Sequence, residues 1–248
     1  MKIVDIFNYL NDLFPVSDAL DFDNVGILVG NPEKTVKNCL ISLDCNLETV
    51  KNAKENGCEL IITHHPVIFE PLKTVLQGSM QYELIKNDIS VISMHTNLDV
   101  GIGGVNDKLC EVLALDEISP VIASDGYLLK SGVISPISAK NLAERIKEQL
   151  GGFVKFVDGG KEIKKVLVCS GSGGGYIEDA INLGFDALIT ADIKHHHFLV
   201  AHDNGLSLFD AGHFNTEDII VEYLAEKLKG QFNEIQFNTF HSKAINFV

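Results

Sequence analysis

Short apolar runs alternate along the chain with segments in which apolar residues recur at helical spacing. The runs predict buried strands at 36–43, 60–63, 89–94, 164–169 and 206–209. The helical spacing predicts helices between them, at 3–14, 47–56, 82–86, 106–113 and 139–150. This alternation indicates an α/β fold in which mixed sheets are flanked by helices and successive strands such as 36–43 and 60–63 run parallel.

The pattern also repeats within the chain. A shift of 127 positions aligns residues 40–43 with 167–170 and residues 60–63 with 187–190, and it places Gly57 over Gly184 and Glu59 over Asp186. Between 115 and 127 the apolar pattern thins and turn-forming pairs occur. We therefore predict two similar α/β domains related by an internal repeat, the first comprising residues 1–122 with 220–248 and the second residues 123–219.

Candidate chemistry begins where the strand at 60–63 ends, because two adjacent histidines follow it. Neighbouring side chains on a strand point to opposite faces, and Pro66 keeps His65 extended, so His64 and His65 could each bind one of two nearby ions. The alternative is a pair of hydrogen-bonded loop histidines. In parallel sheets, however, ligands bind beyond the carboxyl ends of the strands, where this pair is expected to lie.

Two further strands end in polar residues of the same kinds. The strand at 89–94 leads into His95 and Asp99, and the strand at 206–209 is followed by His213 and Glu217. His213 and Glu217 are four residues apart, so in a helix both can face one side and share a metal site. The alternative is a helix start with an acid in its first turn, which the helix dipole favours. Asp23, ahead of an early strand, could reach a site or could only form a turn.

Other suggestive segments carry less weight. Four histidines in a predicted helix spread around its circumference, so at most one of them is expected to line a pocket: His195, His196, His197 and His202. The glycine-rich segment 170–175 has no Walker lysine, so a tight turn is favoured over a phosphate-binding loop.

Four motifs in order resemble one family. The stretches D-N-V-G-I-L-V-G, I-T-H-H-P, H-T-N-L-D and G-H-F-N-T-E resemble those of the Nif-three-like proteins, often labelled GTP cyclohydrolase type 2 homologues, over essentially the whole chain. The resemblance implies a dinuclear metal centre with terminal ligands His64, His65, Asp99 and His213 and with Glu217 as the bridge. It also implies a homohexameric ring with the sites facing an internal cavity. Phe22 departs from the pattern, since many relatives have Trp there, and this change is expected to affect packing.

A dinuclear metal centre of this kind is suited to hydrolytic catalysis. Two ions about 3.5–4 Å apart can generate a bridging hydroxide near neutral pH and can hold the oxygens of a phosphate, so the expected function is that of a dinuclear hydrolase acting on a nucleotide or phosphoester. Three imidazoles and two carboxylates suit two divalent ions of zinc, iron, manganese, cobalt or nickel. His95 is the candidate acid or base, with orientation of a ligand as its alternative role. A metal-binding regulatory or scaffolding protein without turnover is the rival function.

The charge, the cysteines and the lengths of the apolar runs indicate which kinds of partner and compartment to expect. The formal net charge is −14 and the 20 Lys and Arg residues form no concentrated run, so direct binding of nucleic acid is not expected. The five cysteines include no C-x-x-C pair and indicate reduced, mostly packed thiols. The sequence shows no signal peptide and no apolar run of about 18 residues, so we expect a cytoplasmic protein without a membrane span.

Overall fold

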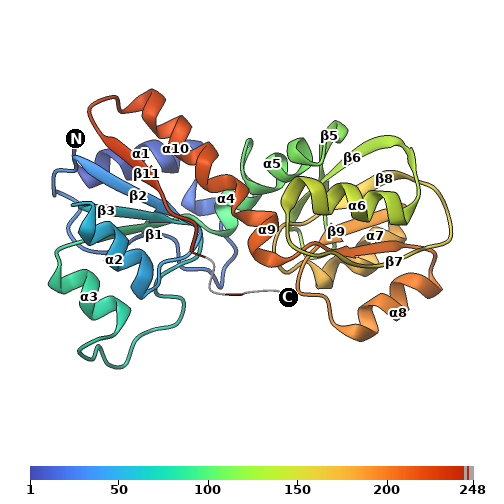
Figure 1. Cartoon of the computed structure of the whole chain (residues 1–248), viewed down its shortest axis with the longest axis horizontal. Helices are drawn as coiled ribbons and strands as arrows, with labels where there is room; N and C mark the ends of the chain where they lie inside the picture. The colour runs from blue at the N-terminus through green and yellow to red at the C-terminus, as the bar shows by residue number, and fades with distance from the viewer. Residues whose placement is uncertain (243–244, 246–248) are drawn as a thin grey trace. The chain divides into compact units, whose positions relative to one another are not determined.

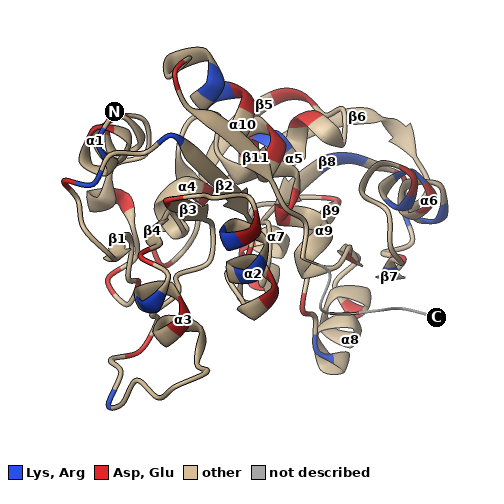
Figure 2. Cartoon of the chain, turned by 60° about the vertical axis from the view of Figure 1, so that its left-hand side comes forward, with Lys and Arg blue, Asp and Glu red and all other residues tan. Residues whose placement is uncertain are grey.

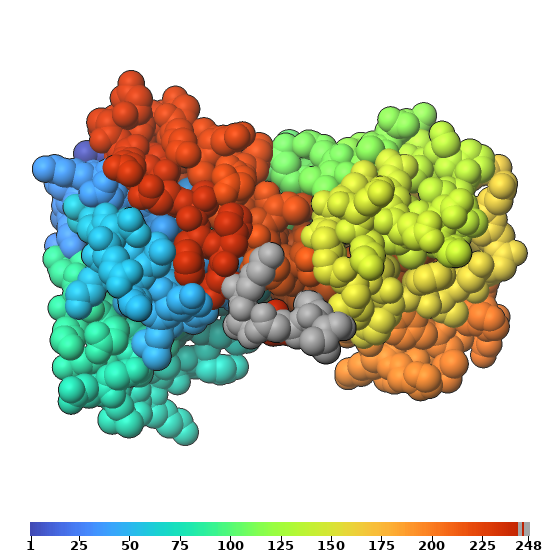
Figure 3. Space-filling view, viewed as in Figure 1, coloured from blue at the N-terminus to red at the C-terminus, as the bar shows by residue number. Residues whose placement is uncertain are grey.

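The chain folds into two compact units in the computed structural model, which describes residues 1–242 and 245 (Figure 1). The first unit comprises Met1–Ile102 and the described residues from Ile220 on, and the second comprises Gly103–Ile219. Residues 243–244 and 246–248, which the sequence assigned to the first domain, lie outside the described residues. Figure 3 shows the packing of the red segment that follows Ile220 against the blue amino-terminal residues of the first unit.

The first unit contains a five-stranded sheet in the order β1-β4-β3-β2-β11. Strands β11, β2, β3 and β4 are parallel, and β1 runs antiparallel to β4 at one edge. The strands are β1 (Gly26–Val29), β2 (Asn38–Ser42), β3 (Leu60–Thr63), β4 (Ser90–Ser93) and β11 (Gln236–Thr239). The helices are α1 (Ile3–Leu13), η1 (Val16–Asp18), α2 (Leu47–Glu55), α3 (Met80–Lys86), α4 (Thr96–Val100) and α10 (Ile219–Gln231).

Apolar side chains on both faces hold this sheet between two layers of helices. Alternate strand residues such as Leu40, Ile61 and Val91 share one core cluster with Val50 of α2 and Leu84 of α3. Figure 1 shows α1 and α10 over the other face of the sheet. The central strands are therefore buried on both sides, which explains why they read as continuous apolar runs.

The second unit contains a six-stranded sheet in the order β5-β6-β8-β9-β10-β7. Its strands β8, β9 and β10 are parallel, and the remaining pairings are antiparallel. The strands are β5 (Asp116–Ile122), β6 (Leu128–Ile137), β7 (Lys155–Val157), β8 (Ile163–Val168), β9 (Ala187–Thr190) and β10 (Ser207–Asp210). The helices are α5 (Val105–Val112), α6 (Ala139–Leu150), η2 (Gly174–Tyr176), α7 (Ile177–Asn182), α8 (His195–Asp203) and α9 (His213–Glu217).

The two sheets share a common plan. Each contains a run of three neighbouring parallel strands, β2-β3-β4 or β8-β9-β10, followed at the edge of the sheet by an antiparallel strand, β1 in the first unit and β7 in the second. A short helix follows the third parallel strand in both units, α4 after β4 and α9 after β10. The α/β class with two mixed sheets flanked by helices is confirmed.

The structure places the boundary between the units at residues 102 and 103, whereas the sequence suggested residues 122 and 123. Strand β5 pairs with β6, and Leu109 and Cys110 of α5 lie in the core of the second unit. The turn-forming residues that suggested a later boundary include Pro120, which lies in an edge strand, where its missing N–H costs no ladder hydrogen bond.

The helical segment that carries His213 and Glu217 is separate from the longer helix after it. Helix α9 ends at Glu217 and α10 begins at Ile219, and the passage from the second unit to the first falls just after Ile219, the first residue of α10. Strands β7 and β11 had no clear signal in the sequence, because each is short and pairs at a sheet edge.

The helices carry charged residues of both signs. Figure 2 shows Lys and Arg dispersed among Asp and Glu on the helices rather than gathered into one basic face. None of the helices in the described part of the chain combines the length and apolar character needed to cross a membrane.

Candidate metal centre

Three histidines of the first unit lie together beyond the carboxyl ends of β3 and β4. His64 and His65 follow β3 directly, and His95 lies two residues after β4. One ring nitrogen of each lies within 4.8 Å of one ring nitrogen of the others. Because β3 and β4 are adjacent and parallel, their carboxyl ends meet at the same edge of the sheet and bring these imidazoles together.

Each of these imidazoles uses Nδ1 to donate a hydrogen bond. His64 donates to the main-chain oxygen of Met94 (2.9 Å), His65 to Oδ1 of Asp44 (2.7 Å), and His95 to Oδ1 of Asp23 (2.9 Å). A carbonyl or carboxylate oxygen can only accept, so the proton of each neutral ring resides on Nδ1. The Nε2 lone pairs are therefore left as potential metal ligands, which is the usual arrangement of metal-binding histidines.

Asp99 adds a carboxylate to this group. It lies in α4, and its Oδ1 is 3.5 Å from Nε2 of His64. Two ligand atoms about 2.0–2.2 Å from one zinc-like ion are separated by roughly 3 to 3.5 Å in a tetrahedral site. His64 and Asp99 thus have the spacing of two ligands that share an ion.

Asp23 is a structural partner of His95 rather than only a turn residue. Its fully buried side chain accepts hydrogen bonds from Nδ1 of His95 and from the main-chain N–H (3.0 Å) and hydroxyl (2.6 Å) of Thr96. Burial acts to raise the pKa of Asp23, but the hydrogen bonds from His95 and Thr96 outweigh it and hold this pKa well below the usual range of a carboxyl group. A permanently ionised carboxylate therefore orients the His95 ring.

The second unit brings together the other two predicted ligands. Helix α9 begins at His213 and ends at Glu217, and Nε2 of His213 lies 3.0 Å from Oε2 of Glu217. Nδ1 of His213 donates a hydrogen bond to Oδ2 of Asp192 (2.7 Å), so this ring also presents Nε2. The spacing of four residues places both side chains on one face, as the sequence predicted.

The glycine-rich segment after β8 lies against this pair. Gly171 has φ +58°, and a Cβ atom at this position would lie 2.1 Å from Oε1 of Glu217 and 3.2 Å from Nε2 of His213. The N–H of Gly171 donates to the Thr216 hydroxyl (3.0 Å), which fixes the segment on α9. The segment is a tight turn, and its missing side chain leaves room for the Glu217 carboxylate.

The remaining histidines of the second unit do not join a candidate site. Among the residues that the structure describes, no group of potential ligands close enough to hold one ion includes a histidine of α8. His202 pairs instead with its neighbour Asp203, and the rings of His196 and His197 contact each other edge to face. These residues therefore serve no metal site within the described structure.

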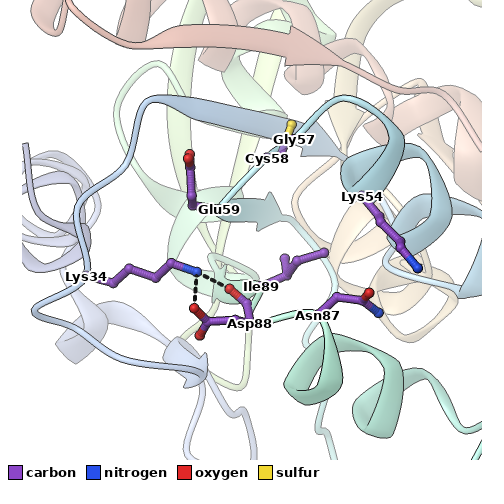
Figure 4. A pocket seen from close by; sticks show the side chains of 8 residues that line it. All are labelled: Lys34, Lys54, Gly57, Cys58, Glu59, Asn87, Asp88 and Ile89. Carbon is purple, nitrogen blue, oxygen red and sulfur yellow. Dashed lines mark hydrogen bonds and ion pairs between the residues drawn. The ribbon is translucent and has the colours of Figure 1, made fainter.

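A pocket of about 220 Å³ lies elsewhere in the first unit (Figure 4). Gly57, Cys58 and Glu59 line it at the amino end of β3, opposite the end that carries His64 and His65. The Glu59 carboxylate is already bonded to main-chain N–H groups, and Lys34 pairs with Asp88 (2.7 Å). Glu59, Lys34 and Asp88 are therefore already engaged, and the pocket is separate from the candidate metal centre.

Three carboxylates orient the imidazoles: Asp23, Asp44 and Asp192. The sequence did not single out Asp44 or Asp192, and it did not assign Asp23 this role. A signal exists for two of them, since Asp44 lies two residues beyond β2 and Asp192 two residues beyond β9. An acid just past the carboxyl end of a strand lies at the edge where the imidazoles gather.

The fold and these side chains define a two-unit α/β protein with histidine and carboxylate groups suited to binding metal. A family model described as Duf34/NIF3 (NGG1p interacting factor 3) matches residues 1–246. The chain belongs to this family, which confirms the resemblance inferred from the four motifs.

Individual relatives match over nearly their full length. A Clostridium perfringens protein named GTP cyclohydrolase 1 type 2 homolog is 38% identical, with 96% of this chain and 95% of that protein covered. The crystal structure of Staphylococcus aureus hypothetical protein SA1388 has a TM-score of 0.91 at 29% identity, covering 100% of this chain and 99% of that one. Reduced HcgD from Methanocaldococcus jannaschii has a TM-score of 0.85 at 29% identity, covering 96% and 97%.

Proposed function

We propose that this protein is a metal-dependent hydrolase that binds two divalent transition-metal ions. The observation that carries the proposal is the shared arrangement of four imidazoles, each of which donates from Nδ1 and presents Nε2. In the proposed centre the terminal ligands are His64, His65, Asp99 and His213, and the bridging ligand is Glu217.

Asp99 and Glu217 each lie close to a point where the chain passes from one unit to the other. Asp99 lies three residues before Ile102, where the chain leaves the first unit, and Glu217 lies two residues before Ile219, where it leaves the second. Each residue of chain spans at most about 3.3–3.6 Å, so both carboxylates are tethered close to these passages. The family resemblance adds that the matching positions in relatives form one dinuclear site.

The donor set fits the proposed ions. Imidazole nitrogen and carboxylate oxygen together suit zinc, iron, manganese, cobalt and nickel, and no thiolate contributes. When bound, such ions would supply Lewis acidity and an activated water for hydrolysis.

His95 is the proposed proton carrier. It lies beside the ligand histidines, with ring centroids 5.1 Å from His64 and 5.6 Å from His65, yet it is not needed to complete the ligand set. Its bond to Asp23 fixes the orientation of the ring, as a general acid or base requires. His95 would move a proton to or from the substrate through Nε2.

A nucleotide or another small phosphoester is the proposed substrate class. The name GTP cyclohydrolase 1 type 2 homolog, carried by the relatives, points to a nucleotide. A phosphoester is also compatible with the chemistry of the proposed site, since paired ions can hold phosphate oxygens.

Assembly into a homohexameric ring in the cytoplasm completes the proposal. Large apolar side chains that are strongly exposed in the first unit include Ile102 (91%), Leu76 (69%) and Phe22 (64%). Association would cover such surface. No disulfide joins any of the five cysteines in the described part of the chain, which suits a reducing compartment. Light scattering that gave only the 27.2 kDa monomer at all concentrations would contradict the assembly.

Metal analysis combined with an activity screen tests the function. Gently purified protein is expected to contain close to two ions per chain and to hydrolyse at least one member of a panel of nucleotides and phosphoesters, with activity lost on chelation and restored by metal. Protein without metal would refute the proposal. Two bound ions without turnover on any member of the panel would favour the regulatory or scaffolding role instead, in which protein ligands close the coordination of the ions.

A further inference from the structure

We infer that Asp192 is a positioning residue for His213, holding its imidazole as an Nδ1–H donor with Nε2 directed at Glu217. The inference deepens the proposed function, because a ring fixed in this way is prepared to bind an ion together with Glu217. It assigns a role to the end of β9, which corresponds to the end of β3 but carries no His-His pair.

One hydrogen bond fixes the ring through Nδ1, and a second carboxylate lies beside Nε2 at the spacing of two ligands that share an ion. Oδ2 of Asp192 lies 2.7 Å from Nδ1 of His213, and Oε2 of Glu217 lies 3.0 Å from Nε2 of the same ring. An ionised carboxylate at Nδ1 selects the tautomer that carries its proton there and leaves the lone pair on Nε2. Without Asp192, no carboxylate would lie at Nδ1 to select this tautomer.

The main chain at Asp192 is held in a conformation that ordinary residues avoid. Its φ is +56°, in the left-handed region, which carries an energetic cost for any residue with a Cβ atom and is best tolerated by Asn and Asp. The side chain is 55% exposed and that of His213 is 36% exposed, so their ion pair adds little to stability. Stability therefore does not explain the strained position, whereas delivery of a carboxylate to Nδ1 does.

The internal repeat gives the same position two roles. Asp192 follows β9 as His65 follows β3, each two residues beyond the end of the strand. In the first unit this position carries an imidazole, and the carboxylate that orients it comes from Asp44, beyond the neighbouring strand β2. In the second unit the position carries the carboxylate, and the imidazole comes from His213, beyond the neighbouring strand β10. Both units thus pair an acid and a histidine across neighbouring strand ends.

Two substitutions separate orientation from stability. Asp192→Asn keeps the size of the side chain and tolerates the left-handed conformation, while removing the charge that selects the tautomer. Asp192→Ala removes the hydrogen bond altogether. The matched control is Asp203→Asn, because Asp203 also accepts from Nδ1 of an exposed histidine, His202, which belongs to no candidate site (3.2 Å).

The first measurement uses metal-free protein labelled with ¹⁵N at histidine, at about pH 9, well above the ordinary histidine pKa of about 6.5. His213, assigned by comparison with His213→Gln, is expected in the Nδ1–H form in the parent and in Asp203→Asn, and as a tautomer mixture in Asp192→Asn. The second measurement is Zn²⁺ affinity by competition with a chelator. One of the two ions is expected to bind ~10- to 100-fold more weakly in both Asp192 variants, and the control is expected to match the parent.

The outcomes distinguish this inference from the proposed function. A parent that binds no Zn²⁺ refutes the proposed centre, and the tautomer of His213 then decides the positioning role by itself. A parent that binds two ions, with Asp192→Asn equal to it in both affinity and tautomer, refutes the positioning role and leaves the centre intact. An unfolded Asp192→Ala does not affect the test, because Asp192→Asn provides both measurements.

Discussion

The carboxylates of Glu59 and Asp186 make matching contacts in the two units. Oε2 of Glu59 accepts from the main-chain N–H groups of residues 37 and 38, at 3.0 and 2.9 Å. Oδ2 of Asp186 accepts from those of residues 164 and 165, also at 3.0 and 2.9 Å. All these positions are related by the same shift of 127 residues that aligns the apolar pattern. The repeat therefore extends to the hydrogen bonds that join the first two parallel strands of each sheet.

Replacing Asp186 with Ala is expected to destabilise the protein in a pH-dependent way. The substitution leaves the N–H groups of Lys164 and Lys165 without their carboxylate, at a cost of roughly 1–3 kcal/mol. Burial acts to raise the pKa of Asp186, but hydrogen bonds from Lys165, Lys161 and Lys164 outweigh it, and the folded pKa lies below the ordinary 3.8.

The sign of the pH dependence follows from this lowered pKa. The ionised carboxylate stabilises the fold above the ordinary pKa, and the stabilisation is lost as the pH falls through the lower folded value. The difference in unfolding free energy between parent and Asp186→Ala, measured by urea denaturation, should therefore be constant from pH 7 to about 5 and shrink below about pH 4. A difference that grows on acidification would contradict the role of the charge.

Replacing Glu217 with Gln is expected to weaken both ions together. If Glu217 bridges them, Gln removes the negative charge and one strong oxygen ligand from each ion. His65→Ala, by contrast, should empty chiefly one site. Metal titration of the two variants distinguishes these patterns, and two tightly bound ions in Glu217→Gln would show that the carboxylate is only the acid of a helix start. Hydrolase activity is expected to be lost in both variants, since it depends on both ions.

Replacing His95 with Gln is expected to separate catalysis from metal binding. Loss of a general acid or base typically lowers the rate by about 10²- to 10⁴-fold, and because His95 is not assigned as a ligand, both ions should remain bound. The measurement is kcat together with metal content in the same preparation. A variant that loses an ion along with its activity would show that His95 is a ligand.

Replacing Gly171 with Ala is expected to disrupt the second-unit ligands. The added methyl group would collide with the Glu217 carboxylate, which would have to move from its position beside His213. Gly184→Ala is the matched control, since Gly184 also has a positive φ, +74°, but has open space around its Cβ position. Both variants should lose about 1 kcal/mol of stability through backbone strain, and Gly171→Ala alone should lose metal affinity. Equal metal affinity in the two variants would contradict the close approach.

Much of the fold was evident in the sequence. The strands β3 and β4 are short apolar runs bounded by polar residues, and the helices α2 and α6 follow Asn46 and Ser138, which accept from main-chain N–H groups of the first turn. The predicted ligands were also visible, because each follows the end of an apolar strand. These signals are local, so a single stretch of chain is sufficient to read them.

Pairing between distant segments was decided only by tertiary structure. Strand β5 joins the second unit through its pairing with β6, and β11 returns the end of the chain to β2 of the first unit. Their own residues are weakly patterned, since edge strands expose one side to solvent. The position of the boundary at residue 102 depends on this pairing and not on any turn signal.

The sequence by itself determined which residues carry the candidate chemistry, because histidines and carboxylates at strand ends are a property of local order. Tertiary structure alone decided which acid orients which imidazole. Asp23 and His95 are 72 residues apart, and Asp192 and His213 are 21 apart, and each pair meets only because the fold brings separate segments together. The tautomer of an imidazole depends on the acceptor within reach of Nδ1, and that acceptor is supplied by packing rather than by neighbouring sequence.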